Sequence, residues 1–440
     1  MRKCLTKENF NDFLLKSMPI VFFSALTGLV SGIIVVLYGY GADFLSHTSF
    51  SIYIMVREAP AFIPLLLLAL CLLAFISYIL LKVFPDAIGS TIPYNHKKGC
   101  SSWWQVLTGT ITRSYVSFFA SLSLGVEGPS TTIGLALGEG ISKIFKSRRL
   151  SDKDLKEVSR YVSSSGTASA ITAVLNAPIA GLTFMLEEVE HRVSLLALLG
   201  GATSVTTSYF TSYALRSLLE IEQIILPIST TTLPLNYYWT LPIVAVATGL
   251  LGVAFASLLS NFKQLKFIKR IPVLARLIFT FIVTGLVGVA LTYSLGGGAS
   301  LIKTLFSENL PTWVLLTLLI LEVLLTTIAM GSESSGGLLL PSLAIGALIG
   351  ALLGKLLVKL GLPSEYYHTF ILLGAFSFLG TVFHAPVTSI VLAFEMTGIY
   401  NNVIPVALEV VLSFAVAELA LYCIKQLINR KKSKNFSITS

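Results

Sequence analysis

Charged side chains are scarce in this chain of 440 residues, of which Asp, Glu, Lys and Arg make up only 12%. Soluble domains carry about 25% charged residues. Hydrophobic residues account for 54% of the chain, and so little charge cannot cover the surface of a water-soluble fold. The scarcity therefore excludes a soluble globular protein.

Cysteine and histidine are also sparse. The chain has four cysteines, at positions 4, 71, 100 and 423, and five histidines. Neither set has the spacing of a metal site or of a disulfide framework, so we expect no metal and no cofactor. Because no nucleophile–base arrangement is apparent either, we expect the protein not to be an enzyme.

Long apolar runs are what the chain has instead. They cover residues 18–39, 61–84, 236–260, 272–295 and 311–330. Each is long enough to cross a bilayer as an α-helix, whereas outer-membrane strands alternate in pieces of about ten residues. We predict an all-α polytopic membrane protein with a single transmembrane domain over residues 1–440.

The basic residues indicate which ends of the spans face the cytoplasm. Most of the 31 lie in four clusters, at 2–16, 143–160, 263–276 and 425–434. Cytoplasmic ends are enriched in Lys and Arg, so we expect both termini in the cytoplasm. The loops with almost no basic residues are expected outside; they are 40–60, 217–235, 296–312 and 361–369. The chain has a formal net charge of +9 at pH 7. Because the basic residues gather at the ends of the apolar spans, this charge does not indicate nucleic-acid binding.

Two groups of residues recur along the chain at nearly one offset. The first group recurs 212 residues later, with Pro129-Ser130, Ile133-Gly134 and Gly138 corresponding to Pro341-Ser342, Ile345-Gly346 and Gly350. The second group recurs 208 residues later, with Gly166, Ala177-Pro178 and Glu187 corresponding to Gly374, Ala385-Pro386 and Glu395. Order and offset favour an internal duplication, although glycine rows in tightly packed helices are an alternative.

Corresponding loops of the two copies differ in charge. The basic cluster at 143–160 has a counterpart near 355–370 with only two basic residues, and loop 40–60 corresponds to the basic segment 262–276. The halves therefore face opposite sides. We predict inverted repeats over approximately 18–215 and 234–415, an architecture of many ion-coupled transporters. A last helix and basic tail follow at 416–440.

Three glycine–proline breaks interrupt the apolar surroundings. They are Gly89-Ser90-Thr91-Ile92-Pro93, Gly125-Val126-Glu127-Gly128-Pro129 and Gly336-Gly337-Leu338-Leu339-Leu340-Pro341. Proline is tolerated in the first turn of a helix, so each break predicts a helix start with free N–H groups and a positive dipole end. Several such ends together form an anion site without a full positive charge.

Glu127 lies at one of these helix starts. Its carboxylate can occupy the anion site itself and act as a gate, and a protonated form can carry a proton. The alternative is an acid that stabilises the helix N-terminus. A broken helix within an inverted repeat favours the gate.

Glu187 and Glu188 end the apolar helix that begins at Asn176-Ala177-Pro178. Adjacent helical residues point about 100° apart, so only one of the two need face the interior. That acid could pass protons from the cytoplasm toward Glu127. An ion pair between Glu188 and Arg192 is the alternative. Four other acids at membrane depth receive no transport role, and Glu395 is expected to cap or pack at a helix end; the four are Glu322, Glu395, Glu409 and Glu418.

Together these motifs resemble the CLC family of chloride channels and chloride/proton antiporters, over nearly the whole chain and in the family's order. The break at Gly89–Pro93 resembles GSGIP, that at Gly125–Pro129 resembles G(K/R)EGP, and Gly337–Pro341 resembles GxFxP. The segment from Asn176 to Glu188 resembles the family's segment with an internal proton-transfer glutamate.

The resemblance implies a role for each matching residue. The Ser90 hydroxyl and the backbone N–H groups of Leu338 and Leu339 would bind the central anion. Glu127 would be the external gate and Glu188 the internal proton-transfer group. Tyr422 is the best match to the family's central tyrosine. Thr91, Val126 and Leu339 depart from the family pattern, replacing a glycine, a basic residue and a phenylalanine, and they put rate and coupling in doubt.

The resemblance further implies a chloride/proton antiporter that works as a homodimer in the inner membrane of a prokaryote, in contact with lipid and without cytoplasmic regulatory domains. Chloride and protons would be its substrates. Two alternatives remain open: a passive voltage- or pH-gated chloride channel with the same anion pathway, and a membrane scaffold or enzyme without transport.

Overall fold

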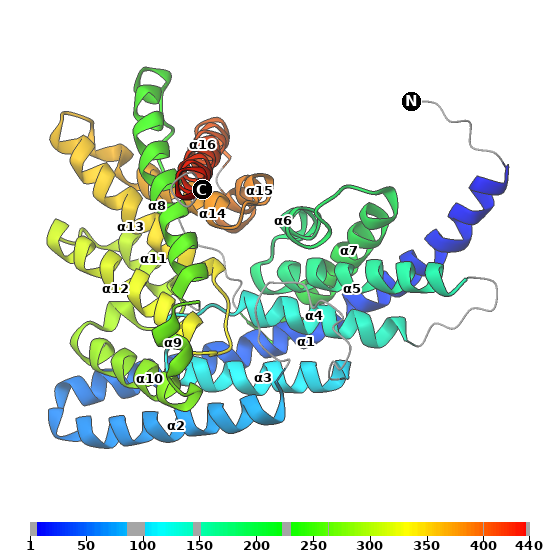
Figure 1. Ribbon diagram of the computed structural model, residues 1–440, viewed down its shortest axis with the longest axis horizontal. Coiled ribbons are helices and arrows are strands. Elements are labelled where there is room, and N and C mark those ends of the chain that lie inside the picture. The colour runs from blue at the N-terminus through cyan, green and yellow to red at the C-terminus, as the bar shows by residue number, and fades with distance from the viewer. Residues whose placement is uncertain are drawn as a thin grey trace.

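The computed structural model describes residues 7–85, 102–143, 151–221, 230–262, 264–398 and 400–436. Every regular element in these ranges is helical (Figure 1). Seven of the helices are long and apolar enough to cross a membrane, over Phe13–Glu58, Pro60–Val83, Leu235–Phe262, Val273–Ala290, Thr312–Gly331, Leu339–Lys359 and Val403–Gln426. The prediction of an all-α, multi-pass integral membrane protein is confirmed.

The helices of the first half are α1 (Lys7–Glu58), α2 (Ile63–Val83), α3 (Trp103–Phe119), α4 (Glu127–Ser142), α5 (Asp152–Leu175), α6 (Pro178–Phe184) and α7 (Leu195–Leu218), with a π-helical turn (Met185–Glu190) after α6. Those of the second half are α8 (Leu241–Phe262), α9 (Lys266–Arg270), α10 (Val273–Ala290), α11 (Ala299–Ser307), α12 (Thr312–Gly331), α13 (Leu339–Lys359), α14 (Tyr367–Val382), α15 (Pro386–Thr397) and α16 (Val403–Phe436).

Three predicted boundaries are wrong. Residues 40–58, expected in a loop, belong to α1, and α11 lies inside the expected loop 296–312. The last helix does not begin at 416, because α16 starts at Val403 and continues without a break. Neither 42–58 nor 406–436 contains a glycine or proline to end a helix. At about 1.5 Å per residue, the 52 residues of α1 exceed the bilayer thickness, so an upright α1 would extend beyond the membrane.

Helices α4 and α13 lie in the interior of the molecule. Most of the side chains of α4 are buried. In the apolar window of α13, 72% of the residues are buried, against 22% to 44% in the other spans. Neither helix therefore presents a full face to lipid. These two central helices begin at the second and third glycine–proline breaks.

Glycines allow each central helix to approach the next helix in the chain. A β-carbon on Gly134 of α4 would overlap the carbonyl of Gly166 in α5, and one on Gly166 would overlap the carbonyl of Gly134. Gly346 of α13 and Gly374 of α14 have the same mutual relation. The crossing of α4 with α5 thus recurs in α13 with α14, at the offsets of the sequence repeat.

Candidate ion-transport site

The starts of α4 and α13 meet through a pair of backbone hydrogen bonds. The N–H of Gly125 donates to the carbonyl of Gly337 at 2.8 Å, and the N–H of Gly337 donates back to Gly125 at 2.6 Å. The two glycines form an antiparallel bridge, two residues before each helix begins. The helix starts predicted at the second and third breaks are confirmed, and Gly128, Pro129 and Pro341 lie in their first turns.

Glu127 occupies the space between these two starts. Its side chain is fully buried, and neither carboxylate oxygen has a hydrogen-bond partner among the described residues. The backbone N–H groups of Glu127 itself and of Leu340 approach the carboxylate without reaching hydrogen-bond geometry. The carboxylate thus lies beside the N–H groups of two helix starts without being fixed by a hydrogen bond in hydrogen-bond geometry, which is the position that an anion would take and which favours the gate interpretation.

The glycines at the bridge provide the room for this carboxylate. A β-carbon on Gly125 would overlap the Glu127 carboxyl group, and one on Gly337 would lie 2.6 Å from its Oε2. Any other residue at either position would displace the carboxylate. The two glycines therefore serve the placement of Glu127 as well as the backbone turn, which the sequence motif alone did not reveal.

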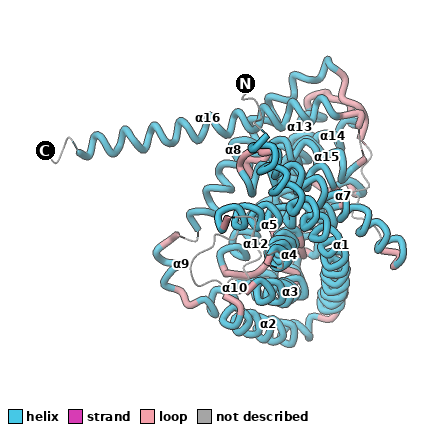
Figure 2. Tube along the Cα trace, turned by 90° about the vertical axis from the view of Figure 1, so that its right-hand side faces the viewer, coloured by secondary structure: helices cyan, strands magenta, loops and turns pink. Residues whose placement is uncertain are grey.

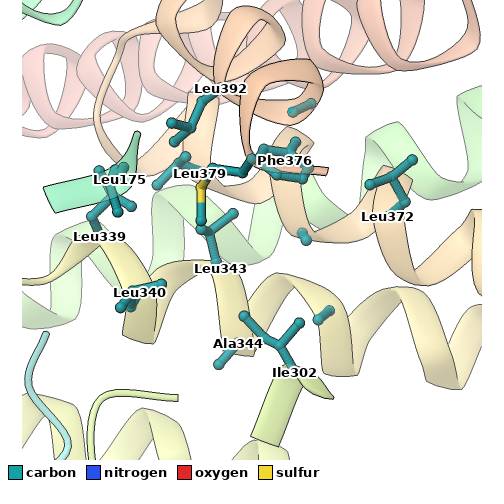
Figure 3. Packing of buried hydrophobic residues seen from close by; sticks show 14 of the residues in the cluster. Leu175, Ile302, Leu339, Leu340, Leu343, Ala344, Leu372, Phe376, Leu379 and Leu392 are labelled. Atoms are coloured by element: carbon teal, nitrogen blue, oxygen red, sulfur yellow. The ribbon is translucent and has the colours of Figure 1, made fainter. Parts of the chain in front are cut away.

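Leu338 and Leu339 are the N-cap and the first residue of α13. N–H groups at these positions have no acceptor inside the helix, so they are available to an anion beside the start of α13. The Leu339 side chain is buried beside Leu175 of α5, in an apolar cluster that also includes Leu379 and Leu392 of other helices (Figure 3). This packing places hydrocarbon against one side of the helix start. Ser90, Gly89, Thr91 and Pro93 lie outside the described residues.

Tyr422 does not join this group. It lies on α16, its side chain is 61% exposed, and its hydroxyl accepts a hydrogen bond from Gln426 at 2.8 Å. The C-terminal part of α16 projects away from the helix bundle (Figure 2). Because α16 has no break, the chain makes no turn that would return Tyr422 to Glu127.

Two glutamates exchange caps between the halves. Glu187, in the π-helical turn, accepts hydrogen bonds from the N–H groups of Val387 (3.1 Å) and Thr388 (2.8 Å) at the start of α15. Glu395, at the end of α15, accepts from Ile179 (2.9 Å) and Ala180 (2.7 Å) at the start of α6. The prediction that Glu395 caps a helix is confirmed, and Glu187 has the same role.

We expect Glu395→Ala to destabilise the protein by about 1–2 kcal/mol, because the N–H groups at the start of α6 lose a charged acceptor. Thermal unfolding of the purified protein in detergent measures this as a lower transition temperature. Glu418→Ala is the control, since Glu418 is 53% exposed. An equal transition temperature for the two variants would contradict the capping role.

Glu188 differs from its neighbours in having no such partner. Glu190 receives a hydrogen bond from Ser164 at 2.6 Å and pairs with Arg160 at 3.3 Å, and Glu187 is a cap. Glu188 is half-buried and makes no hydrogen bond or ion pair within the described ranges, so the alternative pairing with Arg192 is absent. Of the three acids in the π-helical turn, Glu188 alone has no hydrogen-bond or ion-pair partner among the described residues. Such turns are frequent at functional sites.

These features define a class of protein: a multi-pass helical membrane protein with an unpaired acid buried between two helix starts. The chain matches the family described as voltage gated chloride channel over residues 72–418. This match covers most of the chain, and the protein therefore belongs to that family, the CLC family.

Curated relatives and solved structures agree with this assignment. An H(+)/Cl(-) exchange transporter ClcA of Salmonella schwarzengrund is 28% identical over 88% of this chain and 83% of its own length. That of Yersinia pseudotuberculosis is 26% identical, over 88% and 82%. The structure of a slow cyanobacterial Cl⁻/H⁺ antiporter superposes with a TM-score of 0.79 at 20% identity, over 94% of this chain and 98% of the other.

A CLC-type fluoride/proton antiporter superposes with a TM-score of 0.72 at 21% identity, over 94% of this chain and 95% of the other. At these identities the structural matches establish the fold.

Proposed function

We propose that the protein is a chloride/proton antiporter. The observation that carries the proposal is the fully buried, unpartnered carboxyl group of Glu127 between the starts of α4 and α13. An anion and a carboxylate compete for the same positive helix ends. The relatives named as H(+)/Cl(-) exchange transporters support chloride and protons as the two substrates.

Chloride binds to N–H groups at the helix starts. The N–H groups of Leu338 and Leu339 and the hydroxyl of Ser90 coordinate the central anion. When chloride from the cytoplasm moves outward past Glu127, it displaces the carboxylate, which then takes up a proton from outside. The neutral acid no longer competes for the positive helix ends, and the proton leaves toward the cytoplasm as the carboxylate returns.

Glu188 transfers protons between the cytoplasm and Glu127. Glu188 has no hydrogen-bond or ion-pair partner within the described ranges, which supports this role. Hydrogen bonds from fixed donors would stabilise the ionised carboxylate and so oppose its protonation. The same observation favours exchange over a passive channel, which has no need for a second acid.

The assembly and topology belong to the same proposal. The chain forms a homodimer in the inner membrane of a prokaryote, with lipid around it and both termini in the cytoplasm. Its inverted repeats cover approximately 18–215 and 234–415. The antiparallel bridge between Gly125 and Gly337 and the exchanged caps of Glu187 and Glu395 support the repeats, since a twofold axis in the membrane plane produces such reciprocal contacts.

Purified protein in liposomes tests the function. An outward chloride gradient should drive protons inward against their own gradient, and removing chloride should stop the proton movement. Empty liposomes with the same gradient are the control. Chloride flux without proton movement would reject the antiporter in favour of the channel.

A further inference from the structure

We propose that Glu322 is a positioning residue for the segment that precedes the gate. The proposal rests on the antiporter function of Glu127 and adds a residue to that site. Glu322 lies on α12, is 1% exposed, and has no part in the proton path described above. Its carboxyl group accepts a hydrogen bond from the Ser123 hydroxyl at 2.8 Å. Ser123 is four residues before Glu127.

A short series of hydrogen-bonding side chains joins the segment before α4 to helix α12. Ser123 is also 2.8 Å from the hydroxyl of Thr326, one turn further along α12. A serine hydroxyl has a single proton. If Ser123 donates it to Glu322, then Thr326 must donate to Ser123. All three side chains are buried, so the series runs from Thr326 through Ser123 to Glu322.

The segment between α3 and α4 is held from several sides. The carbonyl of Ser121 accepts from the N–H of Gly296 at 3.0 Å, and Gly125 is bonded to Gly337. A β-carbon on Gly297 would lie 2.7 Å from the carbonyl oxygen of Leu124, which shows how closely the start of α11 approaches. Ser123 is the residue of this segment that α12 holds through a side chain.

Glu322 also lies near the loop before α11, and this loop approaches the start of α13. A β-carbon on Gly298 would lie 3.7 Å from Glu322 Oε1 and 3.2 Å from the carbonyl oxygen of Leu340. Gly298 has a φ of 91° and precedes α11. One buried carboxyl group is thus next to the segment before α4 and the loop before α11, and that loop approaches the first turn of α13. Loss of the hydrogen bond between Glu322 and Ser123 removes one of the interactions that fix the backbone segment just before Glu127.

Two substitutions separate the hydrogen bond from the carboxyl charge. Glu322→Gln keeps an oxygen that can accept from Ser123, whereas Glu322→Leu has no acceptor. Ser123→Ala removes the donor at the cost of one oxygen atom. We expect Glu322→Leu and Ser123→Ala to lower the number of protons moved per chloride by about fivefold, because loss of one buried hydrogen bond changes an equilibrium by roughly that factor. Glu322→Gln should remain near the wild type.

Paired chloride and proton fluxes in liposomes give this ratio, which does not depend on the fraction of protein that is folded. The double variant Ser123→Ala/Glu322→Leu should be no worse than either single variant. Glu409→Leu is the matched control, since Glu409 is a fully buried acid on α16, with no partner for either oxygen in the described chain.

Three outcomes would overturn the proposal: a wild-type ratio in Ser123→Ala, losses that multiply in the double variant, or an equal loss in Glu409→Leu. Should Glu322→Leu fail to fold, Ser123→Ala decides alone. If the wild type moves chloride without protons, the antiporter function fails instead. The same variants are then judged by a fivefold change in chloride flux, with an unchanged flux overturning the positioning role.

Discussion

Replacing Glu127 by glutamine is expected to abolish proton movement while chloride still crosses the membrane. An amide is nearly isosteric with the acid but cannot be protonated or deprotonated in the accessible range. The buried space between Gly125, Gly337 and the first turn of α4 accepts it without rearrangement, because the carboxyl group it replaces makes no hydrogen bond with the described residues. The protein should therefore fold normally.

The measurement is the same paired flux in liposomes. Proton uptake by Glu127→Gln should equal that of empty liposomes, and chloride flux should stay measurable. Glu409→Gln is the matched control, because it also replaces a fully buried acid without a hydrogen-bond partner among the described residues, but one that lies inside α16 rather than between the starts of α4 and α13. Proton coupling at the wild-type level in Glu127→Gln would refute the gate. Loss of coupling in Glu409→Gln would show that replacing a buried acid elsewhere also abolishes coupling, so that the effect is not specific to Glu127.

The helix starts at the centre of the site could be predicted because their signals are local. Glycine before proline marks a turn followed by a first helical turn, and the observed starts of α4 at Glu127 and α13 at Leu339 agree. That the two starts pair through Gly125 and Gly337 could not be read from either motif. The bridge joins residues that are 212 positions apart, and only the repeat suggested that they correspond.

The lengths of α1 and α16 were missed for a physical reason. Few basic residues predict that a segment lies outside the membrane on the external side, but the number of basic residues does not determine where a helix ends. Absence of glycine and proline over 42–58 and 406–436 was the available signal. It would also have warned against Tyr422, because a helix that continues without a break makes no turn that would bring this residue to the helix starts.

The pair Glu187 and Glu188 could not be resolved from the sequence, because the deciding contacts are tertiary. The donors to Glu187 belong to α15, about 200 residues away, and Glu190 is held by α5. Because Glu187 and Glu190 are engaged in these hydrogen bonds and this ion pair, Glu188 is the acid of the three without a partner in the described structure. Resemblance to the family pointed to the same residue by position, so two independent arguments agree on it.

Glu188→Gln is accordingly expected to stop proton flux while chloride flux persists. The half-buried side chain makes no hydrogen bond or ion pair with the described residues that an amide would break, so the fold and the helix starts at Glu127 should be unchanged. What is lost is a group that takes a proton from the cytoplasm. Chloride flux in liposomes should remain within about a factor of two to three of the wild type, the usual spread of such effects for a substitution away from the binding groups.

Its neighbour provides the contrast that makes this test specific. Glu187→Gln changes the same functional group one residue earlier, but it weakens the cap on Val387 and Thr388. We expect that variant to be less stable in detergent and yet to couple protons to chloride, because Glu188 is intact. Equal loss of chloride and proton flux in Glu188→Gln would mean that Glu188 supports the fold. Loss of coupling in Glu187→Gln alone would move the proton path to the capping acid, in which case the exchanged caps would have to break during each transport cycle.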